Sequence, residues 1–248
     1  MADYEDRALR SQSAAAGLVD TGLRSYMLRV YNYMLVGLLL TGATAYAVAE
    51  IPAIRELFYA VNPATMRMGL TPLGWVALIA PIALVFFISF RITRMSLATA
   101  QTSFWAYAGI NGIALAPIVL AYAGADVAQA FFVTAATFGA MSLYGYTTQR
   151  DLTGFGSFLF MGLIGIVIAM IVQFFLQSAV MNFVISVIGV LVFTGLTAYD
   201  TQWIKNAYVS GDDTATAGKK AIYGALKLYL DFINLFLFIL RLMGNGRR

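Results

Sequence analysis

One acidic residue lies in the middle of an apolar stretch. Residues 225–242 read ALKLYLDFINLFLFILRL, and Asp231 has Leu, Tyr, Phe and Ile on both sides. A charged Asp near the centre of a membrane-spanning helix costs about 2.5–3.5 kcal/mol on insertion scales, so it should face the protein interior and have a partner. Lys227 lies four residues earlier, on the same face of a helix, and can supply an ion pair of purely structural value.

A second acid, Asp200, closes the preceding apolar stretch within GLTAYDTQWIK, residues 195–205. The two stretches can form neighbouring antiparallel helices. If the last helix begins deep enough on that side, Asp200 and Asp231 come together. Two close carboxylates do not both ionise cheaply, so they would share a proton and titrate as a pair. The chemistry that we expect of this pair is proton sensing.

The chain contains no cysteine and no histidine. This excludes a disulfide, a thiolate nucleophile, a zinc cluster, a histidine-ligated haem and a Ser-His-Asp triad. A response between about pH 5 and 8 must then come from other side chains, and buried carboxylates are the leading candidates. No phosphate-cradling Gly-rich motif or basic-aromatic surface is present, so we expect no cofactor, no resident metal and no nucleic-acid partner.

The composition is that of a protein that crosses the lipid bilayer several times. Of 248 residues, 60% are hydrophobic and 11% are charged, with a mean hydropathy of +0.78, whereas soluble domains have about 25% charged residues. A helix needs about 20 residues to cross the hydrocarbon core of about 30 Å. Seven apolar stretches of about this length are present, at residues 26–49, 70–90, 104–122, 128–146, 155–176, 180–199 and 221–242.

We therefore expect an all-α membrane bundle of seven transmembrane helices over residues 26–242. The polar residues 1–25 lack an apolar core followed by a cleavage site, and they are predicted to form a cytoplasmic tail rather than a signal peptide. Residues 243–248 form a short basic tail. Polar side chains within the stretches are expected to hydrogen-bond between helices; they are Asn32, Asn111, Gln173 and Asn234.

The placement of Lys and Arg predicts which way the bundle faces. Nine of them lie on one side: Arg7, Arg10, Arg24, Arg91, Arg94, Arg150, Lys205, Lys219 and Lys220. Five lie on the other side: Arg55, Arg67, Arg241, Arg247 and Arg248. The positive-inside rule then places the N-terminus in the cytoplasm and the C-terminus outside. If the last stretch re-entered instead of crossing, the bias would become twelve to two, so that alternative stays open.

Three long motifs resemble the Bax inhibitor-1 family, also called the TMBIM or YccA/YetJ-like family. They are FTGLTAYDTQWIK at 193–205, LYLDFINLFLFILRLMG at 228–244, and FGAMSLYGYTTQRDLTGFGSFLFMGLIGI at 138–166, and the resemblance extends from about Arg24 onward. It implies seven helices with the last one central, and a pH-sensitive calcium leak across the membrane. It also implies that the paired proton-sensing aspartates are Asp200 and Asp231, with calcium as the permeant ion.

The resemblance also implies an arginine latch on one aspartate. Counting back from GINGIALAPIV at 109–119, the latch falls on Arg94 in FRITRMS, and Arg91, one helical turn earlier, is the alternative. Some relatives pair an acid in the second helix with an arginine near the end of the seventh. Arg241 matches that arginine, but residues 70–90 contain no Asp or Glu. Glu50, at the outer end of the first stretch, is then the candidate to replace the missing acid.

A calcium gate of this kind differs from a calcium-binding site. Calcium takes about six to eight oxygen ligands, and two carboxylates facing an arginine do not make such a cage, so calcium contact at Asp200 and Asp231 would be transient. With Asp200 ionised, a bridge from Arg94 would close the cytoplasmic mouth. Protonation would remove the charge and loosen the bridge, which is an electrostatic switch on a two-state element.

Two other classes of function are compatible with some features of the sequence. An intramembrane aspartyl protease would place Tyr-Asp in one helix and a second Asp in the next, as at Tyr199-Asp200 and Asp231, but it carries Gly-x-Gly-Asp, where this chain reads Leu-Tyr-Leu-Asp. We therefore do not expect an enzyme. A regulatory membrane protein that binds a membrane protease complex or a death- or stress-pathway protein is the stronger alternative. The compact chain favours a prokaryotic inner membrane.

Overall fold

The structure is a computed structural model of the chain, and it describes residues 2–61 and 68–245, with side chains from residue 21 to residue 244 outside that gap. Its elements, in chain order, are α1 (Ala2–Glu50), α2 (Pro52–Phe58), β1 (Tyr59–Val61), β2 (Met68–Leu70), α3 (Pro72–Arg91), α4 (Leu97–Ala121), α5 (Gly124–Thr147), α6 (Thr153–Leu176), α7 (Ala179–Asn206) and α8 (Thr214–Asn245).

Six of the described helices are long and apolar enough to cross a membrane: residues Thr21–Glu50 of α1, and α3, α4, α5, α6 and α7. The helix α8, which carries three charged residues in its apolar part, is not among them. Large apolar side chains cover the outer surface, and Phe132, Phe174 and Phe175 are each more than 70% exposed. Soluble proteins rarely expose so large an apolar surface to water, so the chain is a helical membrane bundle.

The helices α4, α7 and α8 begin where short polar side chains cap them, and these caps lie outside the apolar stretches. The helix α4 begins at Leu97 rather than 104, because the Ser96 hydroxyl accepts a hydrogen bond from the Thr99 N–H at 3.1 Å. The helix α7 continues to Asn206, past the predicted end at 199. Asp200 therefore lies inside a helix rather than at its end.

The first connection contains structure that hydropathy did not predict. Residue 70 was expected to open the second span, but it pairs with Tyr59 in an antiparallel hairpin, and α3 begins only at Pro72. The Tyr59 hydroxyl donates to the Ile113 carbonyl at 2.7 Å, which ties this hairpin to α4. The hairpin therefore covers the end of α4 next to the end of α1.

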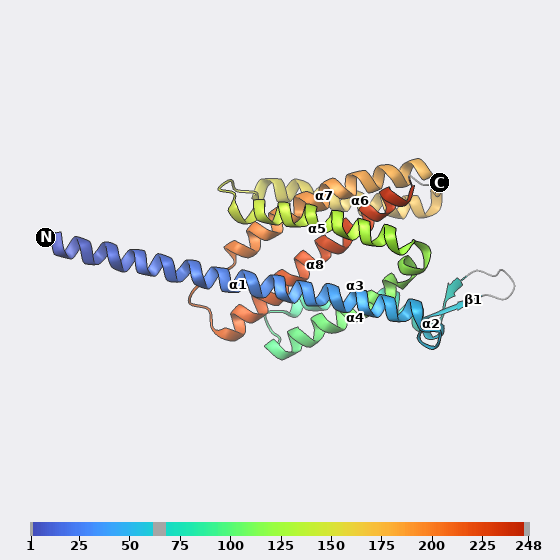
Figure 1. The fold of residues 1–248 in the computed structure, drawn as a ribbon, viewed down its shortest axis with the longest axis horizontal. Helices are drawn as coiled ribbons and strands as arrows, with labels where there is room; N and C mark the ends of the chain where they lie inside the picture. The colour runs from blue at the N-terminus through green and yellow to red at the C-terminus, as the bar shows by residue number, and fades with distance from the viewer. Residues whose placement is uncertain (1, 62–67, 246–248) are drawn as a thin grey trace.

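The helices fall into two groups on either side of α8. Figure 1 shows α5, α6 and α7 on one side of α8 and α1 and α4 on the other. The helix α8 contacts α1, α4, α5 and α7, whereas α3 packs mainly on α4 and α6 mainly on α7. Between residues 216 and 244, α8 has no exposed residue. Every face of this segment is therefore covered at least in part.

The helix α8 runs alongside α4 from one end to the other. Gly218, near its start, lies against the side chain of Leu97 at the start of α4, and Gly244, near its end, lies against the ring of Tyr122 just after α4. The 32 residues of α8 extend over about 48 Å at about 1.5 Å per residue, which exceeds the hydrocarbon thickness of about 30 Å.

Candidate functional site

A buried ion pair joins α7 to α8. The Lys227 ammonium donates to Asp200 Oδ1 at 2.7 Å, and the Asp200 side chain is only 9% exposed. The same ammonium lies 4.9 Å from the centre of the Trp203 ring. The sequence offered Asp231, one turn along the same helix, as the structural partner of Lys227. In the structure the ion pair instead runs across the helix interface to Asp200.

Asp231 lies next to this pair and is 3% exposed. Its carboxyl group interacts with that of Asp200, and its Oδ2 has no hydrogen-bond partner within the described part of the chain. One ammonium, from Lys227, therefore faces two carboxyl groups. If both acids were ionised, one buried negative charge would be left uncompensated, which is costly. A proton or a transient cation at the carboxyl pair would remove that cost.

A pocket of about 730 Å³ opens onto the cluster of Asp200, Asp231 and Lys227. Its walls come from four helices, α3, α6, α7 and α8. Besides the cluster, its polar side chains are Ser89, Ser157, Tyr199, Tyr223 and Asn234. The described residues contain no group of three or more acidic side chains that could hold a metal ion.

The segment of α7 around Asp200 is held by α5 and α6. A Cβ on Gly145 would meet the Ala198 carbonyl oxygen at 2.2 Å, so the backbones of α5 and α7 are in contact there. Gln202 fixes the α5–α6 connection, because its side-chain amide donates to the Arg150 carbonyl at 2.8 Å and accepts from the Leu152 N–H at 2.9 Å. Gln202 was not predicted to bond between helices, although an amide two residues after Asp200 is visible in the sequence.

The opposite face of α8 carries an uncharged network around Tyr229, whose side chain is fully buried. Its hydroxyl accepts from the Asn111 amide at 2.8 Å and lies 2.6 Å from the Thr41 hydroxyl. The Thr41 hydroxyl is 2.9 Å from the carbonyls of Gly37 and Ala108. The prediction that Asn111 bonds between helices is confirmed. Asn234 instead donates to the Leu230 carbonyl of its own helix.

The structure does not place the predicted latch at Asp200. Arg91 and Arg94 are both exposed, at the end of α3 and in the turn that follows it. Between described residues, the cation paired with Asp200 is Lys227. The physical reason is that α3 packs mainly on α4 and that both arginines lie at or beyond its last residue, on the exposed surface.

Glu50 and Arg241 are likewise not brought together. Glu50 is exposed at the end of α1. The Arg241 guanidinium lies over the ring of Phe238, 5.6 Å from its centre. Arg241 thus finds a partner one turn earlier on its own helix, and among the described residues it forms no ion pair with Glu50.

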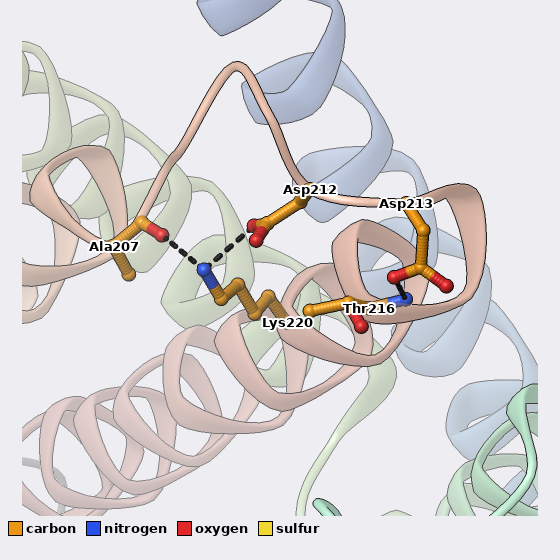
Figure 2. A network of polar contacts seen from close by, with 5 residues as sticks. All are labelled: Ala207, Asp212, Asp213, Thr216 and Lys220. Atoms are coloured by element: carbon orange, nitrogen blue, oxygen red, sulfur yellow. Dashed lines mark hydrogen bonds and ion pairs between the residues drawn. The ribbon is translucent and has the colours of Figure 1, made fainter.

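The connection between α7 and α8 is ordered by two acids. As Figure 2 shows, the Lys220 ammonium donates to Asp212 at 2.6 Å and to the Ala207 carbonyl at 3.1 Å. Asp213 Oδ1 accepts from the Thr216 N–H at 3.0 Å, which makes Asp213 the cap of α8. Hydrogen bonds from Thr216 hold the pKa of Asp213 below its usual value. The cap explains why α8 begins at Thr214 rather than 221.

Comparison with known proteins shows to which family the chain belongs. The family model described as inhibitor of apoptosis-promoting Bax1 matches residues 23–248. The chain is 48% identical to the inner membrane protein YbhL of Escherichia coli K12, over 91% of this chain and 94% of that protein. It is 46% identical to a protein of Caulobacter vibrioides, over 92% of each chain. A membrane protein of Streptococcus pyogenes is 37% identical, over 92% of this chain and 95% of its own length. The chain belongs to the Bax inhibitor family.

Proposed function

We propose that this protein is a pH-sensitive calcium leak whose gate is the cluster of Asp200, Asp231 and Lys227. The observation that carries the proposal is one ammonium facing two buried carboxyl groups, with one carboxyl oxygen left without a partner within the described residues. Membership of the family adds support, because the resemblance of the motifs to that family implies a calcium leak and places its paired aspartates at these positions.

The gate works through the tie between α7 and α8. At alkaline pH, ionised Asp200 holds Lys227 and keeps the two helices together. Protonation of the carboxyl pair weakens the attraction, so the helices part and the pocket beside them admits ions. Lys227, the cation that pairs with Asp200, takes the role that the family resemblance implied for Arg94. Tyr199 and Tyr223 are the other titratable side chains that line the pocket.

The proposal includes seven crossings with α8 at the centre of the bundle, the N-terminus in the cytoplasm and the C-terminus outside. Three observations support it: α8 has no exposed residue between 216 and 244, it runs beside α4 from end to end, and it ends at the opposite end of the molecule from the start of α1 (Figure 1). The printed name of YbhL as an inner membrane protein supports a bacterial inner membrane.

Topology can be tested by reporter fusions. A periplasm-active reporter fused after residue 248 should be active, and the same reporter fused to the N-terminus should be inactive. A C-terminal reporter active only in the cytoplasm would contradict the seven crossings and favour the re-entrant last segment.

Transport can be tested with the purified full chain in liposomes that contain a calcium indicator. Calcium uptake should rise as the pH falls from 8 to 5, and liposomes without protein are the control. Lys227→Met removes the tie and should raise uptake at pH 8 towards the wild-type rate at acidic pH. If uptake does not exceed that of empty liposomes at any pH, the leak is wrong. Regulation by binding a membrane protease complex or a stress-pathway protein would then be the function to pursue.

A further inference from the structure

We infer that Tyr229 is a positioning residue that fixes α8 to α1 and α4. Its role in gating rests on the proposed function, but its role in holding the helix does not. Tyr229 lies two residues before Asp231, and successive residues of an α-helix are about 100° apart, so the two side chains leave α8 in nearly opposite directions at nearly the same depth. The cluster thus acts on one face of α8 while Tyr229 holds the other.

The hydrogen bonds around Tyr229 form a complete chain. Asn111 donates to the Tyr229 oxygen at 2.8 Å, and the Thr41 hydroxyl has two carbonyl acceptors at 2.9 Å. Because each hydroxyl has one hydrogen, the Tyr229 hydroxyl donates to Thr41 at 2.6 Å. Three helices, α1, α4 and α8, are joined by this chain. In this network the Asn111 amide and both hydroxyl groups each donate to an acceptor. A buried network whose donors are satisfied holds a single arrangement.

The network does not change charge over the range in which the gate is proposed to act. Amide and threonine hydroxyl groups do not titrate, and tyrosine ordinarily titrates near 10. Among the described residues, Tyr107 is the titratable side chain whose ring packs on that of Tyr229, with the ring centres 5.3 Å apart. On the opposite face, the groups around Asp231 are Asp200, Lys227, Tyr199 and Tyr223. A fall in pH therefore acts on the α7 side of α8 and leaves the α1–α4 side unchanged.

Packing and hydrogen bonding on this face can be separated. The rings of Phe104 and Tyr107 meet the Tyr229 ring edge-on, with centres 6.2 Å and 5.3 Å away, and Gly37 of α1 leaves room for both Phe104 and Tyr229. These contacts limit sideways movement. The hydroxyl at the end of the ring is what sets the rotation and the depth of α8. Tyr229→Phe therefore removes the positioning contact and keeps the packing.

The test measures the position of α8 directly. The chain has no cysteine, so spin labels can be placed at Ala121→Cys, near the end of α4, and Ala215→Cys, near the start of α8; both residues are exposed. The distance between the labels reports sliding of α8 along α4. We expect one narrow distance distribution at pH 8 and at pH 6. Tyr229→Phe should broaden it, whereas Tyr107→Phe, which also removes one buried tyrosine hydroxyl, should not.

Two results would overturn the inference. One is a wild-type label distance that shifts between pH 8 and pH 6, and the other is a Tyr229→Phe distribution equal to that of Tyr107→Phe. Calcium flux provides a second readout: Tyr229→Phe should raise uptake at pH 8 several-fold over Tyr107→Phe. If the wild-type chain carries no calcium but the label distances behave as expected, the leak fails and the positioning role stands. If the wild-type chain carries calcium but the label distances do not behave as expected, the positioning role fails and the leak stands.

Discussion

On the side of α8 that faces α1 and α4, an uncharged hydroxyl and amide chain holds Tyr229 in place. On the side that faces α7, one ammonium pairs with the buried carboxyl group of Asp200, and the buried carboxyl group of Asp231 lies next to this pair. Both faces are buried, and both join α8 to a neighbouring helix. They differ in whether their interactions depend on protonation, since the first face keeps the same hydrogen bonds at every moderate pH and the second changes its net charge.

This difference suggests how a helix without an exposed face can still take part in a switch. A helix loosened on every side would lose its place in the bundle, and a helix fixed on every side could not respond. Here a neutral anchor and a titratable tie lie on opposite faces at one depth of α8.

The largest effect on stability is expected at the charged face. Lys227→Met leaves ionised Asp200 buried without its cation, and breaking a buried pair in this way costs about 3–5 kcal/mol. Unfolding in detergent at pH 8, followed by circular dichroism, measures the loss. Lys220→Met is the matched control, because its partner Asp212 is more exposed than Asp200, with 17% of the side chain exposed against 9%, and exposed pairs contribute about 1 kcal/mol or less. Equal losses in the two variants would mean that the Asp200 charge is not buried.

Close packing should also distinguish the contact between α1 and α4 from the position of Gly224 on α8. A Cβ on Gly112 would meet the Thr41 carbonyl oxygen at 2.4 Å, so Gly112→Ala must push α4 away from α1. Overpacking of this kind costs about 1–3 kcal/mol. Gly224→Ala, between α8 and α7, meets only the Ile204 side chain at 3.1 Å or more, and Gly109→Ala meets nothing within 4 Å. We expect both to be nearly neutral in the same unfolding assay, and a loss at Gly224 as large as at Gly112 would remove this contrast.

The pH dependence of stability provides a sharper contrast. Thr41→Val keeps the shape and removes the hydroxyl that bonds Tyr229, which costs about 1–3 kcal/mol for the unsatisfied group. This loss should be the same at pH 6 and pH 8, because nothing in the network titrates. The loss in Lys227→Met should shrink at acidic pH, where Asp200 is protonated. Thr41→Ser keeps the hydroxyl and serves as control. A Thr41→Val loss that changes with pH would contradict a neutral anchor.

The smallest effect is expected at the cap of α8, outside both faces. Hydrogen bonds from Thr216 lower the pKa of Asp213 in the folded protein, so its contribution is present above the ordinary Asp pKa and is lost as the pH falls through the lowered value. Asp213→Ala should lower the Tm by no more than a few degrees at pH 7. The difference from wild type should shrink at about pH 3. A difference in Tm that stays constant with pH would mean that the ionised Asp213 carboxylate is not the source of the stabilisation.

The charged face could be identified from the sequence, and the neutral face only in part. Asp231 and Lys227 stand out because charges are rare and costly in an apolar stretch. Asn111 was expected to bond between helices, but its partner was not apparent. Thr41 and Tyr229 are 188 residues apart, and both are ordinary residue types in membrane helices. No local pattern indicates that two such hydroxyls meet.

Partner choice was the main difference between sequence and structure at the site. The family resemblance implied Arg94 as the cation for Asp200, and helix spacing made Asp231 the structural partner of Lys227. The packing of α3 on α4 and of α7 on α8 decides otherwise. The predicted helix ends were wrong for a local reason. An apolar stretch ends where the side chains become polar, but the helix continues to a polar cap such as Ser96 or Asp213.

The most direct test of the proposed gate is the pH profile of calcium uptake by liposomes that contain Asp231→Asn. This substitution keeps the size and the hydrogen bonding of the side chain but removes its charge, so the carboxyl pair can no longer share a proton. Wild-type uptake should rise with a midpoint between about pH 5 and 8, well above the value of about 3.9 for a free Asp. We predict that Asp231→Asn flattens this profile and that Asp200→Asn does the same while raising uptake at pH 8. Aspartate variants that keep the wild-type profile would show that the pair is structural and that the gate lies elsewhere.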